Sequence, residues 1–195
     1  CVLLPKAILP LNIFEPRYLE MIEDAMKSDK YIGIIQPSIS KKENSDTEEV
    51  GCLGKISTYV ENDDGTLIVK LTGVCRFNIN EKLDSDTAYN QMRVSYNQFK
   101  DDLKLNDPIK SIDRDKLLNV ISDYLNVNDL TTDWSVITDT DTEILINAFA
   151  MLSPFSSEEK QALLEAKNIE NRSEILIALS EMSIASRNDK KNNFI

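Results

Sequence analysis

A tight-turn signal between two alternating segments constrains the fold of this chain more than any other feature. Residues 50–60 and 67–79 both alternate apolar with polar side chains, as a strand with one buried face does. Asp63-Asp64-Gly65 stands between them, and an Asp-Gly pair favours the turns that join antiparallel strands. The two segments therefore predict a β-hairpin and argue against a parallel sheet with alternating strands and helices.

Further strand signals surround this hairpin, with one helix among them. Residues 31–35 and 89–99 predict two short strands, and the proline-flanked residues 8–11 predict an edge strand or an extended lead-in. Pro16 suits the first turn of a helix, and apolar residues recur at helical spacing after it. This half of the chain is therefore expected to form an antiparallel sheet that closes into a small barrel, with one early helix.

The second half of the chain carries helical patterns only. Residues 111–187 predict four amphipathic helices that are joined by short loops and suit a small bundle. Asp113 and Asp141 stand where they would cap the first turn of a helix. Ser156 is followed three positions later by Glu159, which is the spacing of a capping box. The predicted fold class is therefore α+β, with the β-barrel first and a C-terminal helical bundle after it.

Composition suggests where this organisation changes along the chain. We predict a β-rich subdomain over residues 1–100, a helical subdomain over 111–187 and a solvated tail over 188–195. Residues 98–112 are polar and contain a proline, which is typical of a linker. Residues 38–49 carry almost no apolar side chain and predict a mobile surface loop.

The charge and the cysteines limit the partners of the chain and its compartment. The net charge of −11 repels phosphate backbones, so broad nucleic-acid binding is not expected. No stretch approaches the roughly 20 apolar residues of a membrane helix, and no signal-peptide pattern opens the chain, so no membrane association is expected. Cys1, Cys52 and Cys75 are odd in number and irregularly spaced. They predict small buried hydrophobes in a reducing cytoplasm. The opening apolar run suggests that further residues precede Cys1.

Residues for catalysis and for metal or cofactor binding are missing from the sequence. The chain has no histidine, which removes Ser-His-Asp and Cys-His arrangements and histidine metal sites. It has no P-loop, no paired CxxC motif and no GxGxxG fingerprint. We therefore predict no catalytic, cofactor-binding or metal-binding residues and no enzyme activity. The five methionines are interpreted as core filling, and Trp134 as an anchor for helix packing.

Three segments of the first half resemble, in order and spacing, motifs of the substrate-binding domain of Lon proteases. These segments are residues 11–18 (LNIFEPRY), 50–56 (VGCLGKI) and 64–79 (DGTLIVKLTGVCRFNI). The segments 150–155 (AMLSPF) and 159–164 (EKQALL) resemble the helical part of short bacterial proteins that carry this domain without an ATPase module.

The resemblance implies a PUA-like pseudo-barrel followed by a helical bundle. In Lon enzymes this region helps to recognise substrates and to assemble the hexamer, so it implies polypeptide substrates or a partner protein, and it leaves a homo-oligomer open. We expect a stand-alone, non-catalytic protein-binding module. The residues expected to form its binding surface lie around the predicted helix start: Phe14, Glu15, Arg17, Tyr18 and Met21.

Two other functions are weighed against protein binding. Other PUA-like barrels bind RNA, and a positive groove lined by Arg76, Arg93 and Lys70 would support this alternative, although the net charge opposes it. An enzyme would need a deep pocket around a buried charged pair.

Overall fold

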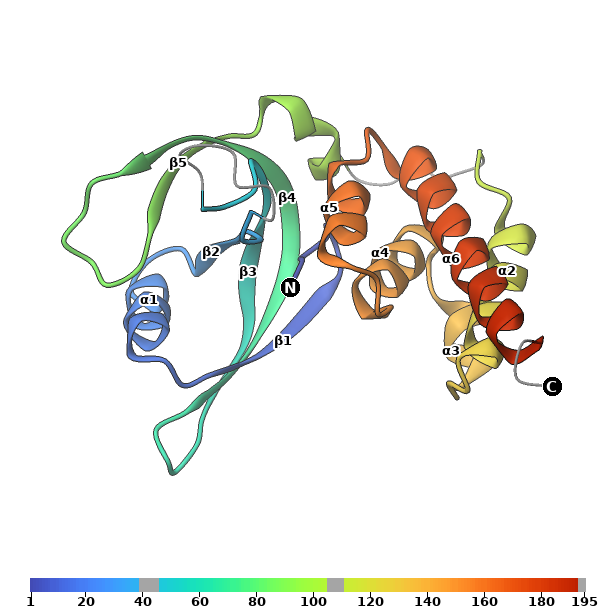
Figure 1. The fold of residues 1–195 in the computed structure, drawn as a ribbon. Coiled ribbons are helices and arrows are strands. Elements are labelled where there is room, and N and C mark those ends of the chain that lie inside the picture. Colours follow the sequence, from blue (N-terminus) through green and yellow to red (C-terminus); the bar gives the residue numbers. More distant parts are fainter. Residues whose placement is uncertain (39–45, 105–110, 193–195) are drawn as a thin grey trace. The chain divides into compact units, whose positions relative to one another are not determined.

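The computed structural model describes residues 1–38, 46–104 and 111–192, with the side chains at 188 and 190–192 left out. The loop predicted at 38–49, the linker at 98–112 and the tail at 188–195 therefore lie partly outside the described residues. The chain divides into two compact units, which we call the barrel unit (Cys1–Leu105) and the helical unit (Asn106–Ile195) (Figure 1).

The barrel unit is an antiparallel sheet, as predicted. Its strands stand in the order β1-β4-β3-β2, and β5 pairs with β4. The strands are β1 (Ile8–Ile13), β2 (Tyr31–Ile34), β3 (Val50–Glu61), β4 (Leu67–Leu83) and β5 (Gln91–Ser95). The predicted edge position of the first strand is confirmed, because β1 ends the order and pairs with β4 alone among the described strands.

The long strand β4 organises the sheet. It pairs with β3 through the predicted hairpin, in which Glu61 lies opposite Leu67 and Gly65 takes the left-handed φ of 79°. Asn78 pairs with Val50 of β3 on one edge and with Ser95 of β5 on the other. Figure 1 shows β4 curving along its length, with β1 crossing one end and β5 beside the other. This curvature turns the sheet into a partly closed barrel.

The core of the barrel unit combines the inner face of β4 with the N-terminal segment. Leu3 and Leu4 are fully buried, although they precede the first strand. Gly73 lets this segment approach, because a side chain there would collide with the Leu4 carbonyl oxygen. Lys6 donates its backbone N–H to the Gly73 carbonyl at 2.8 Å. The N-terminal segment is therefore tied to the middle of β4.

The cysteines are all free thiols. The prediction of buried cysteines is confirmed for Cys52 and Cys75 and is wrong for Cys1, which is exposed. Burial raises the pKa of the Cys75 thiol to about 11, so this thiol stays protonated at neutral pH.

Two short helices complete the barrel unit. The predicted early helix is confirmed as α1 (Pro16–Met26), with Pro16 in its first turn. The linker predicted from residue 98 onwards is wrong in its first half, where the chain forms the 3-10 helix η1 (Asn97–Leu103). Phe99 of this helix is buried, and the carboxylate of Asp102 accepts hydrogen bonds from Arg76 Nε at 2.8 Å and Nη2 at 2.7 Å.

The helical unit contains five described helices instead of the four predicted. They are α2 (Arg114–Val127), α3 (Trp134–Asp139), α4 (Thr142–Leu152), α5 (Ser157–Glu165) and α6 (Ile169–Asn192). The long α6 packs against α2, α4 and α5. The additional helix is α3, where only a turn was predicted. Asp133 caps this helix by accepting a hydrogen bond from the Ser135 N–H at 3.0 Å. No helix in the described part of the chain has the length and apolar character needed to cross a membrane.

Capping residues fix the starts of α2, α4 and α5 as predicted. Asp113 accepts a hydrogen bond from the Lys116 N–H, and Asp141 from the N–H groups of the first turn of α4. Ser156 and Glu159 form the complete capping box. Trp134 is 40% exposed, and its role as an anchor for helix packing stays a prediction.

Candidate functional site

The five residues predicted as a binding surface cluster at the start of α1. Phe14 is 65% exposed in the turn before the helix. The Arg17 guanidinium donates from Nε to Glu15 Oε2 at 2.9 Å and lies 4.5 Å from the centre of the Tyr18 ring. Arg17, Tyr18 and Met21 line one cavity, whereas Phe14 and Glu15 are not part of its wall. The structure therefore brings three of the five together around a hollow.

This cavity has a volume of about 350 Å³ and lies beside α1. A second cavity, of about 340 Å³, extends from it into the barrel and reaches Phe77 and Tyr96. The two share six wall residues: Met21, Gly33, Ile35, Tyr89, Asn90 and Met92. We call these two adjoining cavities together the barrel mouth.

The barrel mouth lies between two strand edges. Its wall includes Tyr31, Ile32 and Gly33 of β2 and Gln91, Met92 and Val94 of β5. Among the strands that the structure describes, β2 pairs with β3 alone and β5 with β4 alone. No described strand therefore bridges β2 and β5 across the hollow.

One hydrogen bond connects the two sides of the mouth. The Tyr89 hydroxyl donates to Asp24 Oδ2 at 3.1 Å and thereby joins the connection between β4 and β5 to α1. Burial, and then the Asp24 carboxylate, raise the pKa of Tyr89, so the phenol stays a proton donor at neutral pH. Figure 1 shows the β4–β5 connection approaching α1.

The floor of the mouth is the ring of Phe77. An added Cβ at Gly51 would lie 2.6 Å from this ring, and one at Gly33 would lie 3.1 Å from it. The ring therefore packs directly on the backbone of these two glycines. Its centre lies 6.3 Å from the centre of the Tyr96 ring, in an edge-to-face arrangement.

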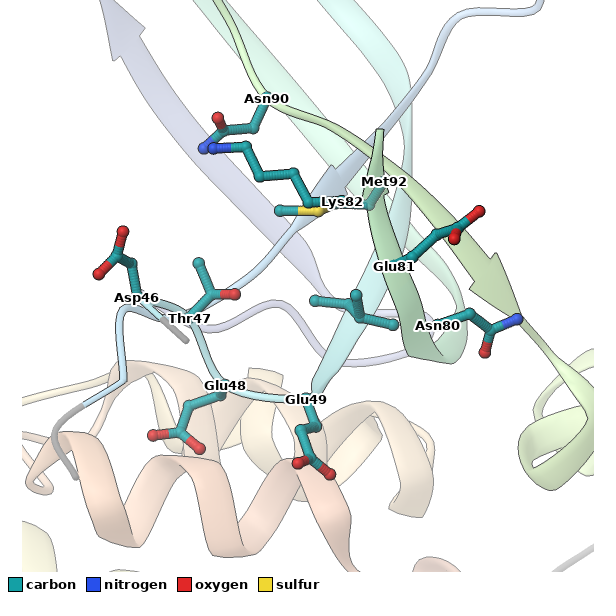
Figure 2. A pocket seen from close by; sticks show the side chains of 10 residues that line it. Asp46, Thr47, Glu48, Glu49, Asn80, Glu81, Lys82, Asn90 and Met92 are labelled. Atoms are coloured by element: carbon teal, nitrogen blue, oxygen red, sulfur yellow. The ribbon is translucent and has the colours of Figure 1, made fainter. Parts of the chain in front are cut away.

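A third cavity, of about 350 Å³, lies next to the mouth and shares Thr47, Asn90 and Met92 with it. Figure 2 shows the carboxylates of Asp46, Glu48 and Glu81 pointing in different directions instead of converging. Within residues 1–38, 46–104 and 111–192, no group of three or more acidic, cysteine or histidine side chains could hold a metal ion. This cavity is thus a polar hollow without a coordinating centre.

The three cations named for RNA binding do not form a groove. Arg76 is buried against Asp102, and Arg93 Nε lies 3.1 Å from Glu81 Oε1. Lys70 is exposed on β4 opposite Pro10 of β1. Two of the three positive charges are therefore neutralised by adjacent carboxylates.

Sequence reasoning missed the residues that face α1 across the mouth. Asn90 and Met92 line all three cavities, and Tyr89 closes the contact with α1. The methionines were predicted to fill the core, but Met21 and Met92 are half-buried cavity walls, and Met182 is 65% exposed. No local signal in residues 89–92 indicates this position, because it depends on a fold that brings two distant segments together.

Comparisons with known proteins agree with this architecture. The family model described as the ATP-dependent protease La (LON) substrate-binding domain matches residues 1–180. The Lon protease of Buchnera aphidicola subsp. Acyrthosiphon pisum is 27% identical over 204 residues, which cover 94% of this chain and 24% of that protein. The Lon protease of Haemophilus influenzae is 24% identical over 189 residues, or 92% and 23% of the two proteins. The chain spans about a quarter of the length of these curated relatives.

Two solved structures have the same fold. The Lon N-terminal domain protein from Xanthomonas campestris matches with a TM-score of 0.64 and 21% identity, over 91% of this chain and 92% of the other. The N-terminal domain of the Mycobacterium avium complex Lon protease matches with a TM-score of 0.64 and 16% identity, over 92% of each chain. With a family model that covers almost the whole sequence, the chain belongs to the Lon substrate-binding domain family.

Proposed function

We propose that the chain is a recognition module and that its barrel mouth binds extended, partly apolar polypeptide segments. The observation that carries this proposal is the position of the mouth between two strand edges that no described strand bridges. The family name, a substrate-binding domain of an ATP-dependent protease, supports polypeptides as the ligand class. Arg17, Tyr18 and Met21 are proposed as part of the binding wall, with Phe14 and Glu15 at its border.

The chemistry of the mouth suits an extended backbone with varied side chains. Strand edges that no described strand covers offer backbone N–H and C=O groups, to which a polypeptide can add as a further strand. Met21 and Met92 supply adaptable apolar contacts, and the tyrosines supply rigid rings with a polar end. Such a wall fits many sequences with moderate affinity, which is what a recognition module for unfolded substrates requires.

We further propose that the chain contributes recognition without chemistry of its own. It matches only the substrate-binding part of relatives that are about four times as long. The described wall of the mouth brings together hydroxyl, amide and thioether groups with one arginine. Turnover of ATP or cleavage of a peptide by the purified chain would contradict this part of the proposal.

The binding test uses a fluorescently labelled, reduced and alkylated model protein that stays unfolded. We expect saturable binding in fluorescence anisotropy and about tenfold weaker binding after Met21→Glu or Met92→Glu, which corresponds to about 1.4 kcal/mol. Each substitution places a charge in the mouth without deleting a core side chain.

The control is the same substitution at an exposed methionine outside the mouth. Met182→Glu in α6 should leave the affinity unchanged, because this side chain is 65% exposed and is not part of the cavity wall. Circular dichroism checks that each variant is folded. Equal affinity of the folded Met21→Glu, Met92→Glu and unsubstituted chains would refute binding at the mouth.

A further inference from the structure

The helical unit contains a second hollow of different chemistry. It has a volume of about 270 Å³ and lies between α2, α3 and α4. Its apolar wall includes Ile121 and Leu125 of α2, Val136 and Ile137 of α3, and Phe149 and Leu152 of α4. We call it the helical groove.

Several apolar side chains of this groove face solvent. Leu152 is 82% exposed, Val136 59% and Leu130 48%. Each could have been polar without cost to the core, since exposed positions tolerate polar residues. Exposed apolar side chains that gather in one hollow are typical of an interaction surface.

The chain segment that forms the groove is strongly acidic. Residues 117–159, which contain the entire wall, include no lysine or arginine. The acidic residues of this segment are Asp123, Asp129, Asp133, Asp139, Asp141, Glu143, Glu158 and Glu159. Asp129 adjoins the wall residue Leu130, and Asp139 and Asp141 stand on both sides of the wall residue Thr140. These three carboxylates and that of Asp133 are exposed.

Three cations from neighbouring segments lie near the groove and offset part of this charge, but the four exposed carboxylates outnumber them. The Arg114 guanidinium donates to the carbonyls of Thr138 at 2.8 Å and Thr140 at 2.7 Å, and so fastens the end of α3. Lys160 donates to the Met151 carbonyl at 2.9 Å, at the end of α4. The positive charge of a third cation, Arg187 of α6, opposes the rise that burial causes in the pKa of Tyr124. The first two hold helix ends, and Tyr124 itself is buried.

We propose that the helical groove binds a polypeptide segment whose apolar side chains are flanked by lysine or arginine. The apolar wall takes the apolar side chains, and the surrounding carboxylates attract the flanking cations, which favours association and fixes orientation. A second copy of this chain fits poorly, because two chains of net charge −11 repel each other. This site lies in the helical unit and is separate from the barrel mouth.

The test compares three short labelled peptides that share one design. The first has a leucine–phenylalanine core flanked by lysines, the second has glutamates in place of the lysines, and the third has serines in place of the core. We expect the first to bind about tenfold or more tightly than either of the others and to lose affinity as salt is added. Equal binding of the lysine-flanked and glutamate-flanked peptides would overturn the proposal.

Two variants locate the site. Leu152→Ser with Val136→Ser removes exposed apolar side chains and should weaken binding of the lysine-flanked peptide about tenfold. The triple variant Asp129→Asn, Asp133→Asn and Asp139→Asn should weaken it similarly and reduce its salt dependence. Asparagine keeps an oxygen that can cap α3 at position 133, so the fold is retained.

The control removes the same amount of charge from the barrel unit. Asp29→Asn, Glu61→Gln and Asp63→Asn lie at exposed positions and should leave binding unchanged. A loss as large as that of the groove triple variant would mean that net charge alone attracts the peptide, and the proposal would fail.

Two further outcomes would also overturn it, independently of the barrel mouth. Loss of lysine-flanked peptide binding in Met21→Glu, with full binding in the Leu152→Ser and Val136→Ser variant, would place the site in the mouth. A dimer in sedimentation experiments that dissociates after Leu152→Ser would show that a second copy occupies the groove.

Discussion

The barrel mouth is assembled from residues far apart in the chain, whereas the helical groove is assembled from near neighbours. Asp24 and Tyr89 meet across 65 positions, while the whole wall of the groove lies within residues 121–153. Losing one long-range contact should therefore disturb the mouth as a whole, and changes in the groove should stay local. Two probes separate the units: Trp134 is the only tryptophan and lies in the helical unit, and all tyrosines except Tyr124 lie in the barrel unit.

The largest effect is expected from the buried ion pair of the barrel unit. Asp102→Ala leaves Arg76 buried without this carboxylate, which should cost about 3–5 kcal/mol of unfolding free energy. Denaturant titration followed by tyrosine near-ultraviolet circular dichroism measures it. The exposed pair Arg93–Glu81 is the matched control, and Glu81→Gln should cost at most about 1 kcal/mol. Trp134 fluorescence should report no such loss of unfolding free energy in the helical unit of Asp102→Ala. An equal loss in both units would mean that they unfold together and would contradict the contrast between them.

A smaller loss is expected where the N-terminal segment meets β4. Gly73→Ala places a methyl group against the backbone of Leu4 and should destabilise the barrel unit by about 1–3 kcal/mol in the same titration. Gly33→Ala meets the end of the Phe77 side chain at 3.1 Å, and this ring can shift by a few tenths of an ångström. It should therefore cost less than Gly73→Ala, and the reverse order would contradict the tight approach at Gly73.

The matching change in the helical unit is local. Asp141→Ala removes the acceptor for the Glu143 and Ile144 N–H groups and should cost about 0.5–2 kcal/mol. Trp134 fluorescence during denaturation measures this loss, while the tyrosine signal of the barrel unit should not change. Asp141→Asn keeps an oxygen acceptor and should recover most of the stability. A loss of barrel stability in Asp141→Ala would show that the groove is not locally built.

The smallest effect is a pH dependence that both units share. Hydrogen bonds from the Ser135 hydroxyl and N–H lower the pKa of Asp133 below 3.8, and those from Thr66 do the same for Asp64. Because the folded pKa lies below the unfolded value, each carboxylate stabilises its unit above pH 3.8, and this contribution disappears as the pH falls through the lower folded pKa. Thermal melts of Asp133→Asn and Asp64→Asn between neutral pH and pH 3 test this. The difference from the unsubstituted chain should shrink only below about pH 4, and a difference that disappears at higher pH would contradict the lowered pKa.

Local signals predicted the elements, and distant contacts decided the site. The Asp-Gly turn, Pro16 and the capping residues act over a few positions, so the hairpin, α1 and the helix starts could be predicted. The motif around residues 11–18 indicated one wall of the mouth. The opposite wall could not be predicted, because Tyr89 and Met92 reach α1 only through the curvature of β4 and the closing of the barrel. The helix η1 was mistaken for a linker for the same reason: Asp102 is an ordinary surface residue until the fold places it against Arg76.

The lack of basic residues from 117 to 159 has a practical consequence for mapping ligands. Trypsin cleaves after lysine and arginine, so complete digestion would release residues 117–160 as a single fragment that carries every wall residue of the helical groove. A photo-crosslinked ligand at the groove would therefore appear in mass spectrometry as a shift of that one fragment, whereas a ligand at the barrel mouth would label other fragments.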